Sequence, residues 1–188
     1  LQEDHILKTK EKNPFLIKLN IWAIVFIIVG IALTYVFFWG NVLVTINPFG
    51  AILYMLALFI FIIIHELLHG ISFVLFSKNK WSTMKFGVSV KSGVAYCISL
   101  VPIKIPRARL SLMMPIYVVC LPVYVYALLT RNFALATLGI LLASGSVGDF
   151  YYMWKLRAIS KSLYMYEELP TKTGYEIGFY VFEKVEGV

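Results

Sequence analysis

Two histidines and a glutamate form the pattern in this sequence that is best suited to chemistry. They are His65, Glu66 and His69, in the run Ile-His-Glu-Leu-Leu-His-Gly. Residues four apart share one face of an α-helix, so the two imidazoles can bind one metal ion while Glu66 lies beside it. This is the arrangement of a zinc hydrolase. The pattern predicts a Zn²⁺ site with His65 and His69 as ligands and Glu66 as the catalytic residue.

Asp149 is the candidate for the third protein ligand that a catalytic zinc site needs. Between Lys12 and Tyr166 it is the only acidic residue besides Glu66. His69 lies nine residues before Lys78 and Asp149 six residues before Lys155, at the ends of two apolar runs. At about 1.5 Å per helical residue, both would lie roughly 9 to 14 Å from a membrane interface. The predicted metal ligands are therefore His65, His69 and Asp149.

The run before Asp149 is Ala-Ser-Gly-Ser-Val-Gly, residues 143–148, which is rich in small residues. Small residues let two helices approach closely in lipid, and a short carboxylate needs such an approach to reach a neighbouring helix. Ser144 and Ser146 in this run would serve packing or help to stabilise an oxyanion. A structural alternative remains for the whole group, in which hydrogen-bonded core histidines and paired acids bind no metal.

The composition is that of a membrane protein. The chain of 188 residues is 60% hydrophobic, with a mean hydropathy of +0.81. Its net charge of +7 does not indicate nucleic-acid binding, because the basic residues flank apolar runs, as they do where they set membrane topology. Cys97 and Cys120 form no redox or metal-binding pair and are expected to be small buried residues.

Four apolar runs are long enough to cross a bilayer as helices, at about 19–39, 52–76, 110–129 and 133–153. Pro115 and Pro122 should bend the third. Lysine and arginine cluster before the first run, after the second and after the fourth, which predicts cytoplasmic amino and carboxyl termini. The expected fold is a mainly α-helical, polytopic membrane protein.

Residues 84–98 alternate with a period of two around Lys-Ser-Gly, which predicts a cytoplasmic β-hairpin between the second and third spans. Its edge would hold an extended substrate by adding it as a further strand, or else the hairpin would be purely structural. The hairpin belongs to a membrane metallopeptidase domain at 1–161, which begins with a solvated basic tail at 1–18. Residues 162–188 form a small cytoplasmic tail, in which 178–183 resemble a short strand.

The box in an early membrane helix, the following hairpin and the later aspartate resemble the site-2-protease type of intramembrane metalloprotease. The chain is still more similar to a small bacterial family of four-span membrane proteins described as zincin peptidases. The resemblance covers roughly residues 15–160. It implies zinc held by His65, His69 and Asp149, Glu66 as the base, and an integral, multi-pass place in the bacterial cell membrane.

One departure from site-2 proteases concerns Asp149, which follows Val-Gly and lacks the asparagine and Leu-Asp-Gly context typical of them. The expected activity is zinc-dependent hydrolysis of peptide bonds near the cytoplasmic side of the membrane, in peptide or membrane-protein substrates. The alternative is a non-catalytic membrane protein that carries or senses a metal or protons, or an inactive relative of the proteases.

Overall fold

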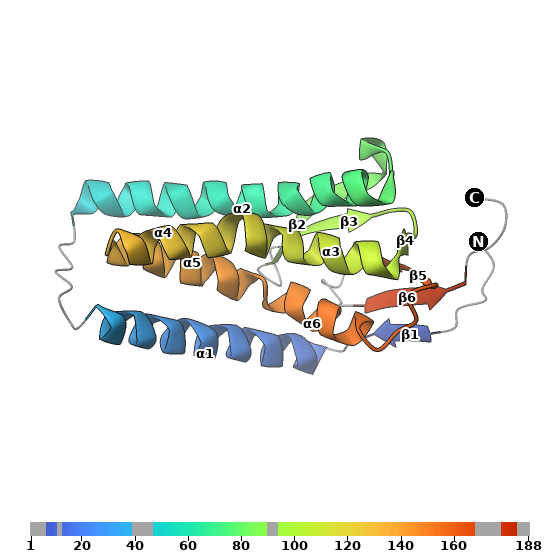
Figure 1. Ribbon diagram of the computed structural model, residues 1–188, viewed down its shortest axis with the longest axis horizontal. Coiled ribbons are helices and arrows are strands. Elements are labelled where there is room, and N and C mark those ends of the chain that lie inside the picture. Colours follow the sequence, from blue (N-terminus) through green and yellow to red (C-terminus); the bar gives the residue numbers. More distant parts are fainter. Residues whose placement is uncertain (1–6, 11–12, 39–46, 90–93, 168–177, 184–188) are drawn as a thin grey trace. The chain divides into compact units, whose positions relative to one another are not determined.

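The computed structural model describes residues 7–10, 13–38, 47–89, 94–167 and 178–183. The fold is mainly α-helical, as the sequence predicts, with short strands at three places along the chain (Figure 1). The helices are α1 (Asn13–Phe37), α2 (Pro48–Ser77), α3 (Ile105–Pro115), α4 (Leu121–Leu129), α5 (Phe133–Gly145) and α6 (Val147–Leu156).

Three helical segments are long and apolar enough to cross a membrane: Ile17–Phe37, Pro48–Ser77 and Ile105–Leu129. A fourth, formed by α5 and α6, passes the same test only as a bent pair. The first two carry large apolar side chains that are exposed, such as Trp22 at 66%, Leu33 at 64% and Ile52 at 65%. A helix that is apolar on all sides and exposed needs a lipid or protein environment, so these segments are compatible with a membrane protein.

Two of the predicted spans are interrupted. Pro115 has no N–H to donate within its helix, and the chain passes through a π-helical turn, Ile116–Cys120, between α3 and α4. The π-helical turn directly follows Pro115, while the bend predicted from Pro115 and Pro122 stays a prediction. The break between α5 and α6 at Ser146 was not expected, because no proline or charged residue marks it in the sequence.

The chain divides into two compact units. One consists of residues 1–18, 66–114 and 149–188, which we call the strand unit, and the other of residues 19–65 and 115–148, which we call the helical unit. Within the helical unit, the hydroxyls of Thr34 and Tyr124 lie 2.9 Å apart and those of Tyr54 and Thr137 lie 3.1 Å apart. These hydrogen bonds link α1 to α4 and α2 to α5.

The strand unit contains the predicted hairpin. A 3₁₀ turn, Trp81–Thr83, leads into β2 (Met84–Ser89), which pairs antiparallel with β3 (Val94–Ser99). Gly87 lies opposite Tyr96 and Phe86 opposite Cys97. The turn predicted at residues 91–93 lies outside the described residues.

The strand unit also contains a four-stranded antiparallel sheet in the order β1-β6-β5-β4. Its members are β1 (Leu7–Lys10), β4 (Ile103–Lys104), β5 (Tyr164–Glu167) and β6 (Gly178–Phe182). Figure 1 shows the blue strand from the start of the chain beside the red strands from its end. The short strand expected near 178–183 is confirmed.

The solvated tail expected at 1–18 is wrong where β1 forms, since Leu7 pairs with Val181 and Lys10 with Gly178. Residue 39, the last of the predicted first span, lies outside the described residues. The same holds for residues 168–177 and 184–188 of the predicted tail. The described strands of the tail share one sheet with β4, which leads directly into α3.

Candidate metal centre

His69 is held by a backbone carbonyl on a neighbouring helix. It lies on α2, and its Nδ1 atom is 3.1 Å from the carbonyl oxygen of Ser111 on α3. A carbonyl oxygen only accepts hydrogen bonds, so Nδ1 must carry the hydrogen and donate. In the neutral ring this leaves the lone pair on Nε2. Such a backbone contact is the usual way in which a metal-binding histidine is fixed in one tautomer and orientation.

The lone pair on Nε2 of His69 faces a carboxylate. Asp149, in the first turn of α6, places its Oδ1 atom 3.3 Å from Nε2. With a neutral imidazole, both of these atoms are acceptors, and two acceptors repel at this distance. A positive species, either a proton on the ring or a cation shared by both atoms, is therefore required between them.

His65 completes the group one helical turn before His69. Ligand atoms of His65, His69 and Asp149 all lie within 4.8 Å of one another, and both histidines are buried. Ligands about 2.0–2.1 Å from a tetrahedral zinc are separated by about 3.3 Å, which agrees with the gap between His69 and Asp149. The group thus fits zinc in donor type, and its one measured separation, between His69 and Asp149, fits zinc in spacing. The structure brings together the three residues named from the sequence, and their role as ligands stays a prediction.

A second hydroxyl ties the same two helices together. The Oγ atom of Ser72 donates to the carbonyl of His69 at 2.9 Å and lies 3.4 Å from the carbonyl of Ser111. Ser72 and Ser111 are both fully buried. The turn of α2 that carries His69 is thus fastened to α3 by side chain and backbone.

The hairpin packs on α2 directly after His69. A Cβ atom at Gly70 would lie 2.5 Å from the Phe86 ring on β2 and 3.4 Å from the Cys97 sulfur on β3. Only glycine admits this approach without a shift of the neighbours. Burial raises the pKa of the Cys97 thiol, and the negative charges of Glu66 and Glu167 raise it further. Cys97 and Cys120 are both buried, as the sequence predicted.

Glu66 is half-buried and lies outside the three-residue ligand group. Its charge acts on Cys97 of the hairpin and on Glu167 of β5. It therefore lies beside the two histidines and near the strands of the hairpin and of β5.

Glu167 is an acid whose place near the candidate group the sequence did not reveal. It ends β5 and lines a cavity with Phe73 of α2 and Leu112 of α3. Burial raises its pKa to about 8; the histidine at position 69 lowers the pKa, while Asp149 and Glu66 raise it. In the sequence it was one acid among several in the tail, and nothing distinguished it from Glu168.

The two serines before Asp149 differ in their hydrogen bonds, and the Ser146 hydroxyl has no partner among the described residues. Ser144 donates to the carbonyl of Leu141 in its own helix at 2.7 Å, and Ser146 is fully buried at the end of α5. A Cβ atom at Gly145 or Gly148 would meet no described atom within 4 Å. The close approach expected at these small residues is therefore not found at the two glycines.

The fold and the site together define a class: a mainly helical protein with long apolar helices and a buried His-His-Asp group that could bind a metal. Residues 58–164 match the model of the family named "Putative zincin peptidase", and the chain belongs to this family. Membership indicates a zinc metallopeptidase. No curated protein and no solved structure matches the chain.

Proposed function

We propose that this protein is a zinc metallopeptidase of the membrane that cleaves peptides or membrane proteins near the cytoplasmic side. The observation that carries the proposal is the pairing of His69 Nε2 with Asp149 Oδ1 at 3.3 Å, with His65 in the same group. Two imidazoles and one carboxylate are a donor set of catalytic zinc sites, which keep a further position for water or substrate.

His65, His69 and Asp149 would hold the metal, and the Ser111 carbonyl would keep His69 in the tautomer that ligation needs. When bound, zinc would supply the positive charge that polarises a carbonyl oxygen and makes water more acidic. Glu66 would take the proton from the attacking water and deliver it to the nitrogen of the breaking peptide bond. The products are a carboxylate and a free amine, so the protons balance.

The membrane setting follows from the apolar helices. With α1, α2, the segment from α3 to α4, and the bent pair α5 and α6 each crossing once, both termini and the hairpin lie on one side. The basic residues near these ends support the proposal that this side faces the cytoplasm of a bacterial cell. A relation in mechanism to site-2 proteases is part of the proposal, supported by the box, the hairpin and the later aspartate.

The hairpin offers a way to hold an extended substrate. Within the described residues β2 pairs only with β3, so its outer edge has backbone groups available for a further strand. Gly70 brings this hairpin against the turn that carries His69. A peptide added to β2 would therefore run close to the metal ligands.

The test uses the full chain in lipid nanodiscs. Wild type is expected to bind about one zinc per chain and to cleave some members of a fluorogenic peptide library. Glu66→Gln should keep the zinc and lose cleavage by at least about a hundredfold, in line with the loss of a general base. Asp149→Ala and His69→Ala should lose the zinc. Zinc binding without any cleavage that depends on Glu66 would overturn the peptidase and favour a metal carrier or sensor.

A further inference from the structure

The backbone groups of the hairpin strand β2 point in two directions. At the start of the strand, the N–H of Leu100 donates to the carbonyl of Thr83 at 2.8 Å. Bonded and non-bonded pairs alternate along an antiparallel ladder, so every second residue from Thr83 onward bonds to β3. The residues between them, including Phe86 and Val88, direct their N–H and carbonyl groups to the open edge, where no described strand pairs with them.

The side chains of Phe86 and Val88 lie on one face of the hairpin. Successive residues of a strand point to opposite faces, so Lys85 lies on the other. The face of Phe86 is the one that meets α2, because the tip of its ring would lie 2.5 Å from a Cβ atom at Gly70. Gly70 directly follows His69. The apolar face of β2 therefore adjoins the turn that carries a candidate metal ligand.

This apolar face is exposed. Trp81, in the 3₁₀ turn before β2, places its ring 5.6 Å from the ring of Phe86. The exposed fraction is 49% for Trp81, 38% for Phe86 and 68% for Val88, and we call these three residues the hairpin patch. A lipid chain would cover the patch but has no groups that pair with the strand edge. An extended peptide does both, so a peptide is the occupant that fits.

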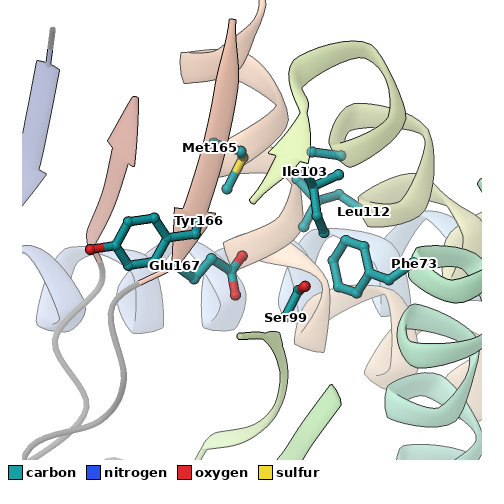
Figure 2. Close-up of a pocket in the computed structure, with 8 residues that line it drawn as sticks. Phe73, Ser99, Ile103, Leu112, Met165, Tyr166 and Glu167 are labelled. Carbon is teal, nitrogen blue, oxygen red and sulfur yellow. The ribbon is translucent and has the colours of Figure 1, made fainter. Parts of the chain in front are cut away.

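The cavity beside β5 offers no comparable site. Figure 2 shows it between Phe73, Leu112 and Glu167, and its volume is about 10 Å³. This is room for one water molecule and not for a side chain. A large side chain of a bound peptide is therefore expected at the hairpin patch.

We propose that the hairpin patch is a specificity subsite for a large apolar side chain of a peptide that pairs with the open edge of β2. The peptide residue opposite Phe86 would exchange two backbone hydrogen bonds with it. Its side chain would lie on the same face and pack on the rings of Phe86 and Trp81. That the peptide is a substrate rests on the proposed function. The pairing needs no cleavage, so it can be tested separately.

The experiment measures peptide binding to the full-length Glu66→Gln variant in nanodiscs, with zinc present, so that no peptide is consumed. The peptides are short chains of serine and threonine with one central phenylalanine, leucine, alanine or aspartate, and binding to empty nanodiscs is subtracted. The phenylalanine or the leucine peptide should bind about tenfold or more tighter than the alanine peptide, as expected for burial of a large apolar side chain. The aspartate peptide should bind no tighter than the alanine peptide.

Methylated peptides test the strand pairing without changing the protein. Methylation of the backbone nitrogen of the central phenylalanine removes the hydrogen that it would donate to the carbonyl of Phe86, and binding should weaken by about fivefold or more. The next nitrogen along the peptide would point away from β2, so its methylation is the control and should cost less than about twofold. Association with lipid would not weaken, because methylation makes the peptide more apolar.

Two variants test the patch itself. Trp81→Ala and Phe86→Ala should each reduce the preference for phenylalanine over alanine to less than about threefold. Lys85→Ala is the matched control, because it changes an exposed residue on the other face of the same strand and should leave the preference unchanged. Thermal unfolding shows whether each variant is folded, and if Phe86→Ala is not, Trp81→Ala and the methylated peptides decide.

Equal binding of the peptides, a preference that survives both alanine variants, or an equal effect of the two methylations would each overturn the subsite. These failures differ from failure of the proposed function, which is read from cleavage of the same peptides by wild type. Cleavage without apolar preference in binding overturns the subsite alone. Apolar preference without cleavage supports the subsite and overturns the peptidase.

Discussion

The ring of Tyr152 on α6 meets the ring of Phe179 on β6 edge to face, with 5.6 Å between their centroids. Both side chains are buried, and Tyr152 lies one turn after Asp149 on the same helix. The contact therefore joins the sheet to the helix that carries the third candidate ligand. In this way a strand from the end of the chain supports the helix that carries a residue of the candidate metal centre.

Phe179→Ala should weaken zinc binding although it removes no ligand. Loss of a buried phenylalanine costs about 3–5 kcal/mol, and α6 loses the support that positions Asp149. We expect zinc affinity to fall by about tenfold, a typical loss for groups that orient ligands. Competition with a chromophoric chelator measures it. Phe182→Ala, a half-buried site on the other face of the strand, is the control, and equal affinities for the two variants would contradict the prediction.

Ser72 and Ser111 should respond in opposite ways to alanine. Ser72 donates to the His69 carbonyl, so Ser72→Ala should lower the free energy of unfolding by about 1 kcal/mol. The Ser111 hydroxyl is buried with no partner among the described residues, and Ser111→Ala should be neutral or stabilising. The Ser111 carbonyl that holds His69 is kept in both variants. Denaturation in mixed micelles compares them, and a larger loss for Ser111→Ala would refute the assignment.

Gly70→Val should disturb the site more than its distance from the ligand atoms suggests. Its Cβ would lie 2.5 Å from the tip of the Phe86 ring, so either this ring or the hairpin that carries it must shift away from α2. We expect a lower midpoint of thermal unfolding and reduced protection of Cys97 from a thiol reagent. Phe86→Ala in the same chain should restore part of both. Gly148→Ala is the control, since its Cβ meets no described atom within 4 Å and should be tolerated.

The group at the metal centre could be predicted because membrane depth restricts where ionisable residues can lie. Between Lys12 and Tyr166 the only acids are Glu66 and Asp149 and the only histidines are His65 and His69, so the similar depth of Asp149 and His69 was enough to pair Asp149 with the histidines. The hairpin could be predicted for a local reason, because the residues at 84–98 alternate between apolar and polar with a period of two. Both predictions needed only the spacing of residues along the chain and, for the candidate metal centre, the rise per residue of an α-helix.

The support of the centre could not be predicted in this way. β1 has the sequence Leu-Lys-Thr-Lys, which resembles a basic tail, and its partner β6 lies at the other end of the chain. Pairing over such a separation leaves no local pattern. Glu167 was hidden for the same reason, because its neighbours Phe73, Ser99 and Leu112 come from three distant segments. Tertiary contacts, rather than composition, bring this acid of the tail to the wall of the cavity.

Glu167→Gln should stabilise the metal-free protein, and the gain should grow with pH. The pKa of this carboxyl is raised from 4.5 to about 8 in the fold, chiefly by burial. Below about pH 4.5 the carboxyl is protonated in both the folded and the unfolded protein. Between about pH 4.5 and 8 only the folded protein holds this proton, so the free energy of unfolding of wild type falls as pH rises. Above about pH 8 this loss is complete. Glutamine does not titrate, so the Glu167→Gln variant does not lose this stability as pH rises. Thermal unfolding with a zinc chelator should therefore show midpoints for wild type and Glu167→Gln that diverge from about pH 4.5 to 8. The Glu183→Gln control, which removes an exposed acid directly after β6, should follow wild type.

Added zinc should reduce the difference in midpoint between wild type and Glu167→Gln, because a nearby positive charge favours the ionised carboxylate and lowers its pKa. A constant difference at all pH values would mean that the carboxyl is not perturbed and that the cavity tolerates its charge unaided.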